Sequence, residues 1–424
     1  MAKLNIRNRN LNKYDKEGRP KAPNWEYRFE AAKVEGKRRS ISKAGFRTKK
    51  DAEVAGAKAM AEYNAAGLKF EPSEMSFADF LDYWFDNYVK MSCKYNTQEA
   101  YRVIIANHLK PALGSYRLRS LTPVMLQDYV NQKFVAGLKK STLTNILSVL
   151  TGSLKYAVVP ACLLQSSPAA YIKKPKLQAE RADVNRTVIS VEDFSRMLER
   201  FGPGNPFRYA LLIGFYTGLR IGEVYGLTWS DIDLKAGTLS VARLVYKRGQ
   251  GETGAWYFGD TKTSASVRTV KIGETLVREL REYRNLQRAH RLEYGGHYTR
   301  IYTRAEKDEK GNTIHRLVEV EGTVPVSLPE VDQVLRKENG QYSSTDSFKY
   351  AARVIHYDLG IRFNFHSLRH THATKLIESG VSPKAVQARL GHENIQTTLQ
   401  TYVHNTEAME QDAVDVFEAA VSTT

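Results

Sequence analysis

Cysteine is scarce in this chain of 424 residues, which carries only Cys93 and Cys162. The two lie far apart and form no CxxC pair, so the sequence favours neither a disulfide framework nor a thiolate metal site. We expect them to be small core residues in a reducing cytoplasm. The chain also lacks a hydrophobic run long enough to span a membrane, and its charged N-terminus has no apolar export segment. We therefore expect a soluble, cytoplasmic protein with no membrane partner.

Acidic residues are too few to balance the basic ones, since 63 Lys and Arg face 46 Asp and Glu, a formal net charge of +17. Residues 1–72 hold 18 basic and 9 acidic side chains, and residues 73–179 hold 13 and 6. The remainder is nearly neutral and ends in residues 405–424, with five acids and no bases. General solubility would account for some of this charge. Two successive basic segments before an acidic tail favour DNA as the partner.

Residues 1–66 are expected to form a small α+β domain. Trp25–Phe29 alternates as a strand does, a turn follows at 35–36, and a return strand comes next. Thr48 is placed to cap a helix after the second strand. A folding or oligomerisation module would explain the same pattern, but the charged strand faces favour DNA contact. The basic residues that we expect to reach DNA from this domain are Arg7, Arg28, Arg38 and Arg39.

Residues 75–172 are expected to form a bundle of four or five helices, because apolar side chains repeat at helical spacing from Ser76 to Tyr156. Pro111 and Pro123 mark expected boundaries between its helices. A polar, basic linker follows over 173–186. The lysines of the bundle that we expect to face DNA are Lys94, Lys139 and Lys140.

The third region, 187–406, begins with a helix that Ser190 is placed to cap. A second helix runs into Thr217-Gly-Leu-Arg220, where Gly218 allows a tight turn and Glu223 is expected to be a buried partner of the arginine.

Further along this region, strands are expected over 238–246 and 267–272, with Lys262 in the turn before the second strand. Residues 290–345 are expected to be a charged, loop-rich insertion without a readable function.

Near the C-terminus, residues 364–404 gather six polar or aromatic side chains suited to phosphate chemistry. The helical spacing puts His366 and Arg369 on neighbouring surface positions of one helix. His392 follows in a turn, and a short helix then presents Tyr402. Arginine binds phosphate oxygens bidentately, histidine transfers protons, and a tyrosine hydroxyl can act as a nucleophile.

The order of these motifs resembles the tyrosine recombinases, the phage integrase family. The pieces are TGLR-x-x-E at 217–223, Lys262, HSLRHTH at 366–372, LGH at 390–392 and a tyrosine ten residues later. The resemblance implies a multidomain chain: an arm-type DNA-binding α+β domain, an all-α core-binding SAM-like bundle, and a mainly α catalytic domain with a small antiparallel sheet. It is most like integrases of conjugative transposons or temperate phages.

The resemblance also implies a reaction and its residues. Tyr402 would attack a scissile phosphodiester to give a 3′-phosphotyrosyl intermediate, without metal, ATP or other cofactor. Glu223 would support the site. The catalytic residues that it implies are Arg220, Lys262, His366, Arg369, His392 and Tyr402.

Partners and location follow from the same resemblance. The expected assembly is a homotetramer on double-stranded DNA with core and arm sites, in a bacterial cytoplasm and associated with the nucleoid. An excisionase and a DNA-bending host factor are the implied accessory partners. The tail, 407–424, spaces apolar side chains as an amphipathic helix does, and we expect it to dock on a neighbouring protomer rather than in cis.

Two alternatives remain open on the sequence. His366 and His370 lie four apart on a helix, as in some metal sites, but the Glu of HExxH and an acidic third ligand are missing. A DNA-binding architectural or regulatory protein without cleavage would explain the charge, but not the ordered series of motifs.

Overall fold

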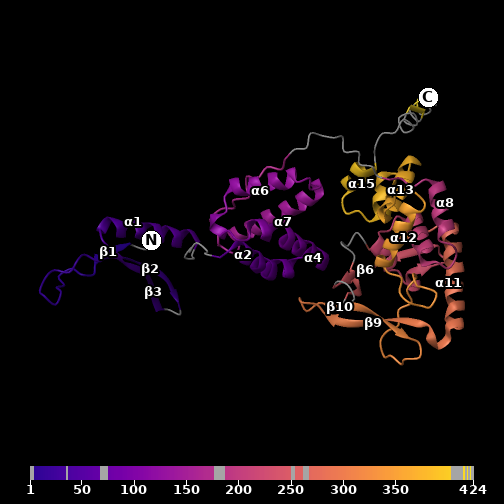
Figure 1. The fold of residues 1–424 in the computed structure, drawn as a ribbon, viewed down its shortest axis with the longest axis horizontal. Coiled ribbons are helices and arrows are strands. Elements are labelled where there is room, and N and C mark those ends of the chain that lie inside the picture. The colour runs from indigo at the N-terminus through magenta and orange to yellow at the C-terminus, as the bar shows by residue number, and fades with distance from the viewer. Residues whose placement is uncertain are drawn as a thin grey trace. The chain divides into compact units, whose positions relative to one another are not determined.

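A computed structural model describes residues 4–34, 37–66, 75–175, 187–249, 254–260 and 267–402, together with 414, 415, 418 and 421. At 31–34, 37–39, 62–66, 397 and 400–402 it describes the backbone alone. The chain divides into two compact units, Met1–Leu177 and Gln178–Thr424, which are treated separately below (Figure 1). Within the described ranges, no helix is both long and apolar enough to cross a membrane.

The N-terminal part is an antiparallel sheet in the order β1-β2-β3, covered by one helix. The expected strands and the helix cap are confirmed, since Thr48 Oγ1 accepts a hydrogen bond from the Asp51 amide at 3.1 Å. The expected turn at 35–36 lies outside the described residues. The elements are β1 (Asn5–Asn8), β2 (Trp25–Val34), β3 (Lys37–Phe46) and α1 (Lys49–Ala66).

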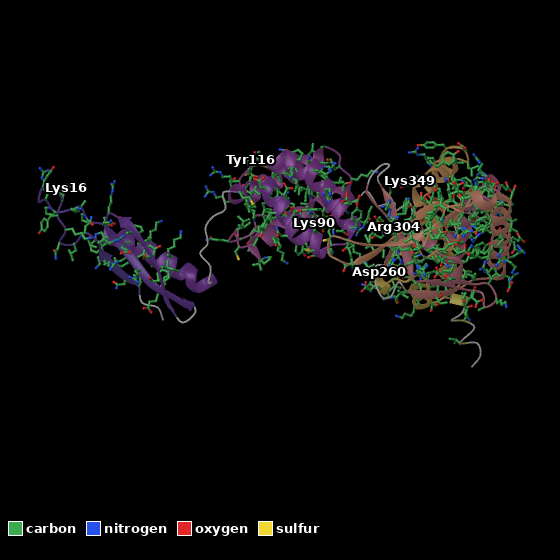
Figure 2. The ribbon with its side chains drawn as sticks, turned by 90° about the horizontal axis from the view of Figure 1, so that it is seen from below. Lys16, Lys90, Tyr116, Asp260, Arg304 and Lys349 are labelled. Carbon is green, nitrogen blue, oxygen red and sulfur yellow. The ribbon has the colours of Figure 1, made fainter. Side chains whose placement is uncertain are left out.

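One face of this sheet packs on α1, because Tyr27 and Phe29 are buried there. Gly56 permits the approach, since a Cβ at that position would lie 2.8 Å from the Tyr27 Cβ. The other face carries Arg7 opposite Glu26 on the neighbouring strand. Lys16, in the connection between β1 and β2, lies at the outer end of this part (Figure 2).

Residues 75–175 form the expected helical bundle. The predicted apolar stripes are buried, for example Phe77, Phe80, Leu81 and Trp84 on the first helix. Two helices pass through π-helical turns, at Phe85–Val89 and Ile105–Leu109. The α-helical segments are α2 (Phe77–Trp84), α3 (Lys90–Ser92), α4 (Tyr95–Ile104), α5 (Lys110–Leu113), α6 (Pro123–Val135) and α7 (Lys140–Val158).

The expectation that both cysteines are core residues is wrong. Cys93 is half-buried and packs against the core of the bundle, and Cys162 is exposed. Cys162 lies in the connection after α7 with a φ of 53°, where the helical periodicity no longer applies.

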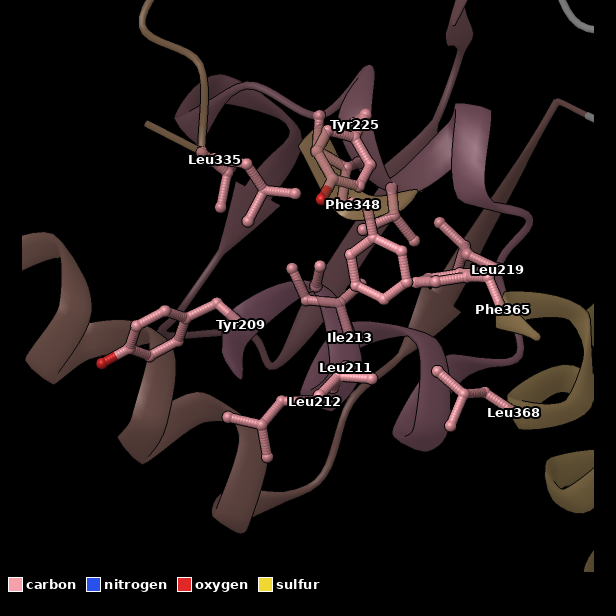
Figure 3. Packing of buried hydrophobic residues seen from close by; sticks show 14 of the residues in the cluster. Tyr209, Leu211, Leu212, Ile213, Leu219, Tyr225, Leu335, Phe348, Phe365 and Leu368 are labelled. Atoms are coloured by element: carbon pink, nitrogen blue, oxygen red, sulfur yellow. The ribbon is translucent and has the colours of Figure 1, made fainter. Parts of the chain in front are cut away.

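The second unit packs its helices around one hydrophobic core. Phe348 lies at the centre of this core with Tyr225, Leu219 and Phe365 around it, and its ring meets Phe365 edge to face at 5.2 Å (Figure 3). The helices are α8 (Val191–Arg200), α9 (Pro206–Thr217), α10 (Ile221–Tyr225), α11 (Glu274–Tyr294), α12 (Thr345–Tyr357), α13 (Phe365–Glu378), α14 (Pro383–Leu390) and α15 (Ile395–Tyr402).

Two antiparallel sheets flank this core, in the orders β4-β5-β8 and β6-β7-β10-β9. The expected single strand over 238–246 is wrong, because the chain changes sheets after Val241. The strands are β4 (Ile232–Asp233), β5 (Thr238–Val241), β6 (Arg243–Arg248), β7 (Ala255–Asp260), β8 (Arg268–Lys271), β9 (Thr299–Lys307) and β10 (Thr313–Glu321).

The expected loop-rich insertion at 290–345 is wrong in part, since 322–344 has no helix or strand but the segment before it does. It contains the β9–β10 hairpin, paired over nine residues and joined to β7, and it lies at the end of the unit away from α13 and α15 (Figure 1). Ile301 and Leu317 anchor the hairpin in the core, while charged side chains alternate outward. The charges of that outer face concealed the strands in the sequence, because a half-exposed strand is polar at every second residue.

Candidate active site

Arg220 lies where a helix begins after a left-handed turn. α9 ends at Thr217, and Gly218 has a φ of 69° that a side chain would strain. A Cβ there would also lie 2.7 Å from Leu390 and 2.9 Å from His372. This turn brings Arg220 to the N-terminus of α10, with its side chain 40% exposed and able to meet a ligand.

Glu223 fixes this arginine. Its carboxylate accepts a hydrogen bond from Arg220 Nη1 at 2.9 Å and another from the Arg220 amide at 3.0 Å. Glu223 is 3% exposed, as a buried partner should be. Burial pushes the pKa of Glu223 upward, but the guanidinium groups of Arg268 and Arg220 outweigh it and hold that pKa below its usual range. The carboxylate is therefore charged at neutral pH.

Arg268 is a residue that sequence reasoning missed. It lies at the start of β8, with its side chain 7% exposed. Its Nη2 donates to Glu223 Oε2 at 3.0 Å, and its Nε donates to the Arg389 carbonyl at 2.8 Å. Nothing in the local sequence marks it, because its partners come from α10 and α14.

Arg369 lies on α13, but not on the helix surface as the spacing suggested. The residue is 1% exposed, because α13 packs against α9. Its Nη1 donates to the Gly218 carbonyl and its Nη2 to the Leu390 carbonyl, both at 2.9 Å. These two bonds hold the guanidinium plane between the α9 and α14 ends.

His366 lies one turn before Arg369 on α13 and remains exposed at its edge. Partial shielding from water lowers the pKa of His366, and the charges of Arg369 and Arg220 lower it further. His392 follows the left-handed Gly391, and its Nδ1 lies 2.9 Å from Thr398 Oγ1. Burial, with Arg369 and Arg220, lowers the pKa of His392 to about 4. Both imidazoles are thus neutral at neutral pH, and both lie within the field of the two arginines.

His372 and Arg389 lie beside this cluster and have a structural role. Arg389 Nε donates to His372 Nε2 at 2.9 Å, so His372 Nδ1 carries the proton and donates to the Phe215 carbonyl at 2.9 Å. Burial, followed by the charge of Arg389, lowers the pKa of His372 to about 4. Arg389 also donates to the carbonyls of Tyr216 and Lys271. Together these bonds join α13, α14, α9 and β8.

His370 meets His366 edge to face at 4.5 Å, which is the pair considered above for a metal site. Among the residues that the structure describes, no group of three or more His, Cys, Asp or Glu side chains is placed to hold a metal ion.

Three expectations lie wholly or partly outside the described residues. Lys262 falls in the segment between β7 and β8, which the structure does not describe. For Tyr402, the last residue of α15, the backbone alone is described. Of the tail at 407–424, only four isolated residues are described, so its helix and its docking stay predictions.

The expected DNA-binding residues are spread over the first unit. Arg7 pairs with Glu26 at 2.9 Å and is 57% exposed, and Arg28 Nε donates to Ser40 Oγ at 3.1 Å. The side chains of Arg38 and Arg39 lie outside the described part. In the bundle, Lys94 before α4 and Lys139 and Lys140 at the start of α7 are exposed, as expected.

Comparison with known families covers all three parts of the chain. The phage integrase family matches residues 204–409, its N-terminal SAM-like domain matches 76–134, and an arm DNA-binding domain matches 10–62. The chain belongs to the phage integrase family. The resemblance in the sequence is thereby confirmed, and so is the expected class of each part.

Individual relatives agree with this family. A tyrosine recombinase XerC-like protein of Caldanaerobacter subterraneus subsp. tengcongensis is 28% identical over 82% of this chain and 84% of its own length. The Tn1549 transposon integrase, solved with a circular intermediate DNA, shares the fold at a TM-score of 0.60 and 18% identity, over 81% of this chain and 99% of that one. A lambda integrase tetramer bound to a Holliday junction shares the fold at a TM-score of 0.53 and 17% identity, over 90% of this chain and 94% of that one.

Proposed function

We propose that this integrase breaks and rejoins DNA at attachment sites to integrate and excise a mobile element, with Tyr402 as the nucleophile. The Tyr402 oxygen attacks the scissile phosphorus and forms a 3′-phosphotyrosyl bond, while the bond to the 5′-oxygen breaks. That oxygen leaves as a free hydroxyl after taking up a proton. The tyrosyl ester conserves the energy of the phosphodiester, so a second strand can reverse the step without ATP.

The observation that carries the proposal is a pair of arginines, each held by its own partners, whose charges both act on His366 and His392. Arg220 is fixed by Glu223, and Arg369 is fixed by two carbonyl groups. In the transition state, negative charge grows on the nonbridging phosphate oxygens. Guanidinium groups that are already oriented stabilise this charge with little reorganisation.

His366 is the proposed base for the Tyr402 hydroxyl. Tyrosine has an unperturbed pKa of about 10, so the proton must be removed as the bond to phosphorus forms. His366 can accept it because its pKa lies below the ordinary value and its ring is neutral at neutral pH. Lys262 is the proposed acid for the leaving 5′-oxygen.

His392 is proposed to donate a hydrogen bond to the phosphate, and Thr398 to set its tautomer. Thr398 is fully buried, and its hydroxyl lies 2.9 Å from His392 Nδ1. When that hydroxyl donates, Nδ1 is the acceptor and the ring proton lies on Nε2. The Nε2 proton is then available to a phosphate oxygen.

For assembly, we propose a homotetramer that holds two duplexes, as the lambda integrase tetramer holds a Holliday junction. The first unit would supply DNA contacts through its exposed arginines and lysines at arm and core sites. An excisionase and a DNA-bending host factor are the proposed accessory partners, acting in the bacterial nucleoid. The acidic tail is proposed to dock on a neighbouring protomer.

The test is covalent trapping on core-site DNA, identified from the sequence beside the gene. A substrate nicked near the cleavage site releases a short fragment and leaves the protein attached to DNA. Wild-type protein should form this adduct in EDTA, and Tyr402→Phe should form none while binding DNA with unchanged affinity. Adduct formation by Tyr402→Phe would assign the nucleophile to another tyrosine. Cleavage that required a metal would contradict the proposed chemistry.

A further inference from the structure

The C-terminal end of α14 is held by two guanidinium groups in succession. Arg268 Nε donates to the Arg389 carbonyl at 2.8 Å, and Arg369 Nη2 donates to the next carbonyl, Leu390, at 2.9 Å. The last carbonyls of a helix have no partner within the helix and form the negative end of its dipole. The two cations therefore share one helix end, and the position of one depends on the position of the other.

The second bond of Arg268 connects this helix end to Arg220. Arg268 Nη2 and the Arg220 amide donate to the same carboxylate oxygen of Glu223, each at 3.0 Å. The other oxygen of Glu223 binds the Arg220 guanidinium at 2.9 Å. A continuous path thus runs from Arg220 through Glu223 and Arg268 to the carbonyl end that holds Arg369.

We propose that Arg268 is a positioning residue that sets the distance and orientation between the two phosphate-binding arginines. It acts through Glu223 on one side and through the end of α14 on the other, and it does not itself contact the phosphate. The inference rests on the proposed roles of Arg220 and Arg369.

The chemistry of the position requires arginine. Two donors must diverge toward a carboxylate and a carbonyl that belong to different elements, and the planar guanidinium supplies them at fixed angles. A lysine ammonium can pair with Glu223, but it lacks the rigid fork. The side chain is 7% exposed, so water is poorly placed to substitute for a lost bond.

The backbone at Arg268 adds a third connection. The residue pairs with Val241 of β5 and lies six positions after Lys262. The strand that follows the Lys262 segment is therefore anchored to the same helix end as Arg369. One residue links the supports of both arginines to the strand next to the proposed acid.

The experiment compares Arg268→Met and Arg268→Lys with a matched control, Arg208→Met, in the full-length protein. Arg208 has the same kind of bonds, to the Glu279 carboxylate at 3.1 Å and to the Leu198 carbonyl at 3.0 Å, but it joins α8, α9 and α11. Single-turnover cleavage is measured at saturating nicked core DNA, next to DNA affinity and thermal melting. A second substrate carries a methylphosphonate at the scissile position, which removes one nonbridging charge.

Arg268→Met should slow cleavage about 100-fold at unchanged DNA affinity, because small displacements of a catalytic group have effects of that size. Arg268→Lys should recover part of the rate, and Arg208→Met should cleave at the wild-type rate. On the methylphosphonate, the defect of Arg268→Met should shrink, since less charge has to be neutralised.

Two results would overturn the inference: wild-type cleavage by Arg268→Met, or equal losses on phosphate and methylphosphonate substrates. An equal cleavage loss in Arg208→Met would also overturn it, because the effect would then be one of general stability. Failure of the wild-type protein to form any adduct would instead contradict the proposed function.

Discussion

The same arrangement, a nearly buried glutamate between two arginines, occurs in two regions of this integrase. In the N-terminal sheet, Glu26 is 5% exposed and lies 2.9 Å from Arg7 and 3.8 Å from Arg9. In the catalytic unit, Glu223 is 3% exposed and lies 2.9 Å from Arg220 and 3.0 Å from Arg268. The hydrogen bond from Arg7 is the main cause that lowers the pKa of Glu26, and arginines also lower that of Glu223.

The difference lies in what surrounds the arginines. Arg7 and Arg9 are 57% and 53% exposed, so their pairing with Glu26 is screened by water and contributes little stability. Arg268 is 7% exposed and continues inward to the end of α14. A carboxylate under exposed cations orients them for an outside partner. A carboxylate that holds a buried cation also fixes the elements of the fold to one another.

The largest effect is expected when the N-terminal region is removed altogether. Deleting residues 1–72 should abolish binding to arm-site DNA and spare cleavage of core DNA, because the proposed catalytic residues all lie beyond residue 219. The loss of 18 basic and 9 acidic side chains should also flatten the salt dependence of binding to long DNA. Fluorescence anisotropy on separate arm and core duplexes measures the affinity for each site and its salt dependence. Retained arm-site affinity would show that arm recognition lies elsewhere.

The second largest effect is expected from a fall in pH, which should destabilise the catalytic unit but not the N-terminal sheet. The pKa values of His372 and His392 are lowered from 6.5 to about 4, so between these values the unfolded chain binds protons that the folded chain does not. The catalytic unit should therefore lose stability as the pH falls from about 6.5 toward 4, on the order of 2 kcal/mol per histidine. Residues 1–66 contain no histidine.

The carboxylates follow the same rule over a lower pH range. Their lowered pKa values give stability that is present above the usual carboxyl range and is lost only as the pH falls through the lowered pKa. The N-terminal sheet should thus keep its protection between about pH 6.5 and 4.5, where the catalytic unit loses it. Amide hydrogen exchange, corrected for intrinsic rates, measures the protection of each region across this pH range. Loss of protection in both regions over the same range would refute the assignment of the acid sensitivity to the two histidines.

Removing one carboxylate at a time sharpens the comparison. Glu223→Gln should destabilise the catalytic unit by about 3 kcal/mol, because it leaves Arg268 buried without its counter-charge. Cleavage should fall about 100-fold as Arg220 loses its orientation. Thermal melting and covalent trapping measure the two effects. The matched control is Glu279→Gln, which breaks the Arg208 pair and should leave cleavage by the folded protein unchanged.

The smallest effect is expected at Glu26, whose arginine partners are exposed. Glu26→Gln should change the free energy of unfolding by less than about 1 kcal/mol. The ratio of arm-site to non-specific affinity should still fall, because Arg7 is less well oriented and one negative charge facing DNA is gone. Competition binding against random duplex measures this ratio, with Glu17→Gln at the exposed Arg19 pair as the control. An unchanged ratio would mean that Glu26 does not orient Arg7 for DNA.

Much of the fold could be predicted because its signals are local. The Thr48 and Ser190 caps and the apolar stripes of the bundle depend on side chains a few residues apart. The β9–β10 hairpin could not be predicted in the same way. Its alternating charges resemble a loop until Ile301 and Leu317 are known to share a core with helices far away in the chain.

The sequence by itself determined the family, the order of the motifs and the identity of the proposed catalytic groups, because each motif is a short run with a fixed spacing. Only the tertiary structure decided that Arg369 is buried, that His366 and His392 are neutral, and that Arg268 joins Glu223 to the end of α14. The reason is physical. Burial, pKa and ion pairing depend on which groups approach through space, and in this site the partners come from α9, α10, α13, α14 and β8.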